Sequence, residues 1–123
     1  MGALFSLWAF FECPQVFGRC AALSPSVQFA GRALQRYVRH RRLRHGRLYL
    51  DAGTLEGRQR RFARLLGLPV RPYLRGVRQL RDALVAGGYR LEHDLRYLEE
   101  EGGEHDERSW SRRLPGALRF LLL

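Results

Sequence analysis

The chain has 123 residues and a formal net charge of +10 at neutral pH. Its length limits it to a single domain, and we expect a modest core because small chains bury a small share of their surface. All 22 of its Lys or Arg positions are Arg. Because Arg pairs bidentately with carboxylate and phosphate groups, the composition favours close contacts with protein or RNA.

The sequence lacks the common signatures of catalytic and metal-binding sites. It contains no GxSxG, GxGxxG, HExxH or P-loop pattern. Cys13 and Cys20 are too few for a disulfide framework and lack CxxC spacing, and the four histidines lack zinc-ligand spacing. His93 stands beside Asp94, but a helical His next to acids is usually solvated or salt-bridged. We therefore predict a non-enzymatic protein with no catalytic residue, no metal site and no cofactor.

The first 25 residues form an apolar and aromatic segment. Residues 1–17 are predicted to form a helix that ends near Pro14, followed by a linker at 18–25. The helix contains Glu12 and is too short to supply the ~20 apolar residues that span a bilayer. We expect it to pack on a partner, to lie at a membrane interface or to form part of the core.

The rest of the chain is predicted to be mostly helical. Apolar residues at helical spacing, with Pro and Gly at segment ends, define the expected helices. A run at 47–50 could form a short strand, but a single strand would have no partner. The pattern predicts an all-α fold, a single domain at 1–123 with four or five short helices, loosely packed and dependent on partner subunits. The expected helices are residues 26–44, 55–66, 72–86 and 89–101 in a helical body at 26–101, before a charged and then apolar tail at 102–123.

The charge changes sign along the chain. Residues 32–81 hold fifteen Arg and two acids, whereas residues 82–107 hold two Arg and nine acids. Acids at the carboxyl end of the helix predicted at 89–101 are unfavourable for the helix dipole, so we expect a basic partner there. The predicted partner interface consists of Arg71, Arg75, Arg78 and Arg81 on one helix, with Asp94 and Tyr97 anchoring the next.

Four short motifs occur in an order that resembles a known family. They are HRRLRHGRLYLDAG at 40–53, ARLLGLP at 63–69, YLRGVRQLRDAL at 73–84 and HDLRYLEEE at 93–101. This order resembles subunit 7 of the mitochondrial cytochrome bc1 complex, the 14 kDa or ubiquinone-binding protein. In the last motif, Asp94, Tyr97 and Leu98 match the Asp-x-x-Tyr-Leu of that family.

The resemblance implies a non-catalytic accessory or assembly subunit of a respiratory complex. Such a subunit would be peripheral to the mitochondrial inner membrane, on its matrix side. It would contact cytochrome b and the core proteins, and its basic block could also meet anionic lipid headgroups.

Two alternatives remain open. The basic block, with Tyr37, Tyr49 and Phe62 available to stack on bases, would also suit a mitochondrial ribosomal protein that contacts rRNA. Arg36 and Tyr37, followed by Arg58 and Phe62, loosely resemble the LYR-type accessory subunits of respiratory complex I, although Leu-Tyr-Arg itself is absent.

Overall fold

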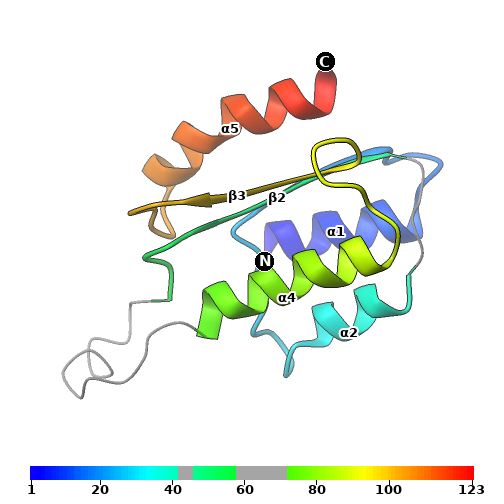
Figure 1. Cartoon of the computed structure of the whole chain (residues 1–123), viewed down its shortest axis with the longest axis horizontal. Coiled ribbons are helices and arrows are strands. Elements are labelled where there is room, and N and C mark those ends of the chain that lie inside the picture. The colour runs from blue at the N-terminus through cyan, green and yellow to red at the C-terminus, as the bar shows by residue number, and fades with distance from the viewer. Residues whose placement is uncertain (42–45, 58–71) are drawn as a thin grey trace.

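The protein is built around a parallel sheet with helices on both faces. The computed structural model describes residues 1–41, 46–57 and 72–123, and in these residues three parallel strands pair in the order β1-β2-β3. Helix α5 covers one face of the sheet, whereas α1 and α4 lie on the other, with α2 packed against α4 (Figure 1). The element bounds are α1 Gly2–Glu12, β1 Arg19–Leu23, α2 Ala33–Arg39, β2 Arg47–Gly53, α4 Pro72–Ala86, β3 Leu95–Glu100 and α5 Glu107–Leu122.

The central strand β2 is buried along all but its first residue. Leu48 lies opposite Cys20 of β1 on one side and Leu95 of β3 on the other. Successive side chains of a strand point to opposite faces, so Leu50 lies in the core beside α4 while Asp51 faces α5. Helices on both faces explain the continuous burial, which is usual for parallel sheets.

Among the described residues, two apolar clusters, one on each face of the sheet, hold the layers together. The larger fills the space between the sheet and α1, α2 and α4, and the smaller lies beneath α5. Full burial of one large apolar side chain stabilises a fold by about 1.5–3 kcal/mol. Leu7, Phe10, Phe11, Leu48, Leu50, Leu80, Leu84 and Leu95 belong to the larger cluster, and Tyr49, Ala117, Phe120 and Leu121 form the smaller one.

The predicted all-α fold is wrong, because a parallel sheet lies at the centre of an α/β structure. The segment at 18–25, predicted as a linker, contains β1. Its residues Cys20, Ala21 and Ala22 are small and include none of the β-branched and aromatic types that mark most strands. The strand at 47–50 is present within β2, and it has two partners where the sequence indicates none.

The helix predicted at 89–101 is also wrong, since these residues contain β3. Leu91, Leu95 and Leu98 have helical spacing, but only Leu95 is buried. The other two leucines are exposed, so the helical spacing does not correspond to a buried helix face.

Alternation along β3 explains the acidic run at its end. Glu99 lies on the α4 side and pairs with Arg78 at 2.8 Å, whereas Glu100 lies on the α5 side and pairs with Arg112 at 2.7 Å. Both acids therefore have basic partners within the chain, and no external partner is needed to neutralise them.

Two of the predicted helices are present as expected. Helices α1 and α4 lie within residues 1–17 and 72–86, whereas the described part of the helix predicted at 26–44, residues 26–41, contains only the short α2. The helix predicted at 55–66 lies mostly outside the described residues. The tail at 102–123 contains α5, and the division of the chain at 25 and 101 stays a prediction. None of the helices in the described part of the chain is long and apolar enough to cross a membrane.

Candidate active site

Polar side chains gather where the three parallel strands end. Strand β1 leads into Ser24, β2 into a turn that carries Glu56, and β3 into a loop that carries His105. The carboxyl ends of parallel strands meet at one edge of a sheet, which is where open α/β sheets bind their ligands. A functional site is therefore expected at this edge.

Glu56 and His105 form a hydrogen-bonded acid–histidine pair at this edge. His105 Nδ1 lies 2.8 Å from Glu56 Oε2, and the side chains are 48% and 1% exposed, respectively. Because a carboxylate only accepts hydrogen bonds, Nδ1 carries the hydrogen and Nε2 is left as the acceptor. The buried carboxylate thus orients a half-exposed imidazole whose Nε2 can take up a proton.

The other oxygen of Glu56 is fixed by donors from three elements. Glu56 Oε1 accepts hydrogen bonds from the Gly53 backbone N–H at 2.7 Å and from the Ser24 hydroxyl at 2.6 Å. The Arg113 guanidinium lies further away, at 3.4 and 3.5 Å. A carboxylate held at Oε1 in this way cannot rotate freely, so Oε2 stays directed at His105.

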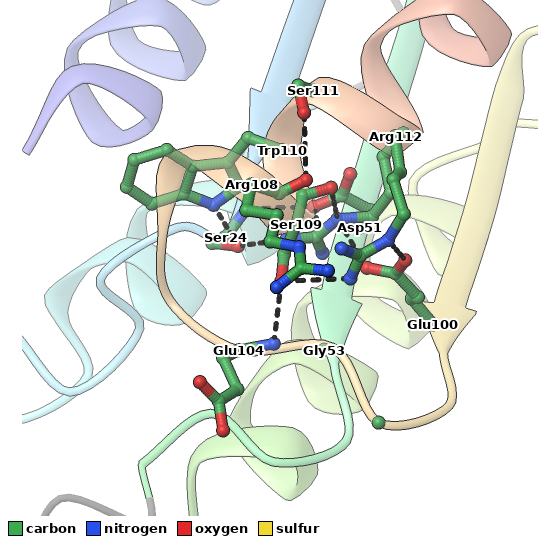
Figure 2. A network of polar contacts seen from close by, with 12 residues as sticks. Ser24, Asp51, Gly53, Glu100, Glu104, Arg108, Ser109, Trp110, Ser111 and Arg112 are labelled. Atoms are coloured by element: carbon green, nitrogen blue, oxygen red, sulfur yellow. Dashed lines mark hydrogen bonds and ion pairs between the residues drawn. The ribbon is translucent and has the colours of Figure 1, made fainter.

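Arg113 of α5 lies at the centre of a buried network. Its side chain donates to Asp51 Oδ1 at 3.0 Å and to Ser24 Oγ at 3.1 Å, and it also pairs with Glu100 at 3.3 Å. Figure 2 shows Trp110 reaching from α5 to Ser24, with Asp51 and Glu100 nearby. The network therefore connects α5 to the ends of all three strands.

Two glycines allow the turn after β2 and the loop after β3 to meet. A β-carbon added to Gly53 would lie 2.9 Å from Cα of Gly103 and would overlap its carbonyl group. The Leu55 N–H donates to Gly103 O at 3.0 Å, and the Gly102 N–H donates to Thr54 Oγ1 at 2.9 Å. This close approach brings Glu56 within reach of His105.

The start of α5 fixes the loop that carries His105. Asp106 is the N-cap and its carboxylate accepts the Ser109 backbone N–H at 2.8 Å, which lowers the pKa of Asp106. Ser109 Oγ in turn accepts the Glu104 backbone N–H at 3.0 Å. The Trp110 ring packs edge-on against the His105 ring at 5.0 Å between centroids. The imidazole is therefore held by two contacts, one with Trp110 and one with Glu56.

Burial shifts the ionisation of Asp51. It raises the pKa of this carboxyl to about 6, against the opposing effects of Arg113 and of the Ser24 backbone N–H. Asp51 is therefore charged at neutral pH and begins to take up a proton in mildly acidic solution.

The described residues supply an acid and a base, and they place no nucleophile against the base. Within residues 1–41, 46–57 and 72–123, no Ser, Thr or Cys is hydrogen-bonded to Nε2 of His105. The Ser24 hydroxyl is directed at Glu56, and burial raises the pKa of Cys20 to about 12, which keeps its thiol unreactive. In the same ranges, no group of three or more His, Cys, Asp or Glu side chains is placed to hold a metal ion.

Neither Glu56 nor His105 is hydrogen-bonded to any described residue of the predicted partner interface. Arg78 and Tyr97 both contact Glu99, and Arg81 lies over the Tyr97 ring at 5.0 Å, so these residues do come together. Asp94 instead pairs with Arg90. Arg75 is exposed on α4 and Arg71 lies outside the described residues. The interface role of all six residues stays a prediction.

Neither Glu56 nor His105 stands out in the sequence. They are 49 positions apart and belong to no common motif. The available signal is that each closely follows a glycine, Gly53 at the end of β2 or Gly103 in the loop after β3. That signal can be read only when β2 and β3 are recognised as parallel neighbours.

A buried carboxylate–histidine pair at the carboxyl edge of a parallel sheet is a feature that α/β hydrolases also have. The chain belongs to the putative esterase family, whose model matches residues 1–121. Among solved structures, it is similar to "Siderophore hydrolase EstB from Aspergillus nidulans", with a TM-score of 0.65 and 23% identity over 98% of this chain. The chain spans 45% of that structure, and the likeness shows a shared fold. No curated protein matches the chain.

Family membership overturns the predicted function. The chain belongs to a family of esterases, so the predicted non-enzymatic accessory subunit of the bc1 complex is wrong. The ribosomal and LYR-type alternatives have no support either, and the predicted partners, cytochrome b, core proteins, anionic lipid and RNA, fall with them. The predicted location at the matrix side of the mitochondrial inner membrane is not tested and stays a prediction.

Proposed function

We propose that the protein is an esterase in which Glu56 and His105 form the acid–base pair. The observation that carries this proposal is the 2.8 Å contact between Glu56 Oε2 and His105 Nδ1 at the carboxyl edge of the sheet. The matched family of putative esterases supports the same reaction class.

The geometry gives each residue a role in ester hydrolysis. His105 Nε2 accepts the proton of a hydroxyl nucleophile as that oxygen attacks the ester carbonyl, and then returns the proton to the departing alcohol. Water attacks the acyl intermediate in the same way, with His105 again taking and returning one proton. Glu56 holds the ring in the required tautomer and stabilises the imidazolium while the proton is on it.

The chain order also fits this class. In α/β hydrolases the nucleophile stands on a strand-to-helix turn and comes before the acid and the histidine, and Glu56 precedes His105 here. The described hydroxyls do not approach His105 Nε2, so we expect a nucleophile other than Ser24.

Hydrolysis of chromogenic esters by the protein expressed from its whole gene tests the proposal. We expect His105→Asn to lower kcat at least ~10³-fold, because the base and the acid of both steps are lost together. His93→Asn is the matched control, since His93 is exposed and lies in the turn before β3. Equal activity of the wild type and His105→Asn would overturn the proposal.

Labelling with a fluorophosphonate, which traps activated serine hydroxyls, identifies the nucleophile. We expect one labelled serine, and we expect His105→Asn to abolish the label while His93→Asn retains it. The similar structure is described as a siderophore hydrolase, so a siderophore that contains ester bonds belongs among the substrates compared. Preference for that substrate over simple esters would extend the proposed function to this class.

A further inference from the structure

The Ser24 hydroxyl has only one way to orient its hydrogen. A hydroxyl donates once and accepts twice. Trp110 Nε1 and Arg113 Nη2 donate to Ser24 Oγ at 2.9 and 3.1 Å. Both acceptor positions are therefore filled, and the hydrogen is directed at Glu56 Oε1, 2.6 Å away.

Asp51 is the closest carboxylate to Arg113. Arg113 Nη1 lies 3.0 Å from Asp51 Oδ1, and the two side chains are 2% and 0% exposed. The contacts of Arg113 with Glu56 are longer, at 3.4 and 3.5 Å, and reach Oε1 alone. Asp51 at 3.0 Å and Glu100 at 3.3 Å therefore lie closer to the Arg113 charge than Glu56 does, and Glu56 Oε2 is left to accept from His105.

The same Asp51 oxygen holds the backbone of Ser24. The Ser24 N–H donates to Asp51 Oδ1 at 2.9 Å, and Ser24 has the unfavourable φ of 48°. Asp51 therefore fixes the main chain of Ser24 while Arg113 fixes its hydroxyl.

Removal of Asp51 would take away the nearest anion of the buried guanidinium and leave it with Glu100 at 3.3 Å and Glu56 at 3.4 Å. A guanidinium prefers to bind both oxygens of a carboxylate, and a buried one needs an anion. The Glu56 carboxylate would be drawn towards Arg113, and its Oε2 would no longer be held in position to accept the hydrogen bond from His105 Nδ1.

We propose that Asp51 and Arg113 are positioning residues for the acid–histidine pair, acting through Ser24 to keep Oε2 of Glu56 directed at His105. The role rests on the proposed function of Glu56 and His105. Neither Asp51 nor Arg113 has a hydrogen bond to His105 in the described structure, so both act on the histidine only through Glu56.

Steady-state kinetics distinguish substitutions that disturb the position of Glu56 from substitutions that only destabilise the fold. Arg113→Lys keeps the positive charge and loses the planar guanidinium that donates to several groups at once. We expect this variant to lower kcat by about 10- to 100-fold, with KM changed less than about threefold. Ser24→Ala should show the same split, and it removes no charge from the interior. Arg119→Lys is the matched control, because Arg119 is exposed on the same helix. If Arg113→Lys and Ser24→Ala lower the melting temperature and keep the wild-type kcat, the positioning role is overturned.

Asp51→Asn tests the other proposed positioning residue. This variant keeps the size of the side chain, and we expect it to lower kcat as Arg113→Lys does. Wild-type kcat in a folded Asp51→Asn variant would remove Asp51 from the proposal.

Proton NMR distinguishes a failure of positioning from a failure of the proposed function. The wild type should show a downfield Nδ1 proton signal from His105 whether or not an ester is hydrolysed. We expect Arg113→Lys, Ser24→Ala and Asp51→Asn to shift or broaden this signal, and Arg119→Lys to leave it in place. A wild type with the signal and no esterase activity would overturn the function alone, whereas an unchanged signal in all three variants would overturn the positioning.

Discussion

Gly53 and Gly103 contact each other where the turn after β2 meets the loop after β3; Gly53 has no room for a β-carbon, and a β-carbon on Gly103 would be crowded. On Gly103, a β-carbon would lie 3.0 Å from Cα of Gly53 and 2.7 Å from Glu100 Oε2. This contact sets the distance between the two segments that carry Glu56 and His105. The acid–histidine pair therefore depends on two residues that have no side chain.

Gly53→Ala should destabilise the fold and separate the pair. Because the obstruction is backbone and cannot rotate away, we expect the free energy of unfolding to fall by at least about 2 kcal/mol. Urea unfolding measures this loss, and the His105 Nδ1 signal reports the separation. Gly116→Ala in α5 meets nothing within 4 Å and should be neutral or slightly stabilising. Equal stability of Gly53→Ala and the wild type would show that the two segments can move apart at little cost.

Asp51 should make stability depend on pH between about 4 and 6. Its folded-state pKa of about 6 lies above the ordinary value of 3.8, so the folded protein binds the proton more tightly than the unfolded chain. The stabilisation is present in full below the ordinary value and is lost as the pH rises through about 6.

The comparison with Asp51→Asn isolates this effect. Relative to that variant, the wild type should gain at most about 3 kcal/mol as the pH falls from 7 to 4. Chemical denaturation at each pH measures the difference. A difference that stays constant, or that grows as the pH rises, would contradict the raised pKa.

Asp94 has a local structural role that its place in the turn before β3 explains. It accepts hydrogen bonds from the Arg90 side chain at 2.8 and 3.2 Å and from the Arg90 backbone N–H at 3.2 Å. The Arg90 side chain lowers the pKa of Asp94, so its contribution to stability is present at neutral pH and is lost as the pH falls below the usual carboxyl range.

Asp94→Ala should lower the free energy of unfolding at pH 7 by about 1 kcal/mol. Glu92→Gln, which breaks an exposed ion pair with Arg96, should cost no more than about 0.5 kcal/mol. Thermal unfolding of both variants at pH 7 and in acid measures these losses. Asp94→Ala should cost more than Glu92→Gln at pH 7, and this difference should disappear at low pH. If Glu92→Gln costs as much as Asp94→Ala, the turn is not held by Asp94.

The amphipathic helices could be predicted from the sequence, and the sheet could not. Helix α4 has an apolar stripe bounded by Pro72 and by the glycines after Ala86, which are local signals. Strand β1 is built from small residues and β3 from charged ones, and both form because they pair with β2. Pairing between distant segments leaves no local pattern in chains of this composition.

The candidate site was hidden for the same reason. Glu56 and His105 meet because Gly53 and Glu100 are opposite each other in the parallel register of β2 and β3. Without that register, His105 is one of four unclustered histidines and Glu56 is one of two acids in a basic segment. The charge reversal along the chain, which suggests external partners, instead reflects pairs such as Arg78 with Glu99 within the fold.

The most direct test of the acid–histidine pair is a double-mutant cycle on kcat for ester hydrolysis. Glu56→Gln should lower kcat by at least about 100-fold and His105→Asn by at least ~10³-fold, and the double variant should be no slower than His105→Asn alone, because the two residues act as one unit. Losses that multiply in the double variant, or a Glu56→Gln variant with wild-type kcat, would show that the buried carboxylate does not serve the histidine.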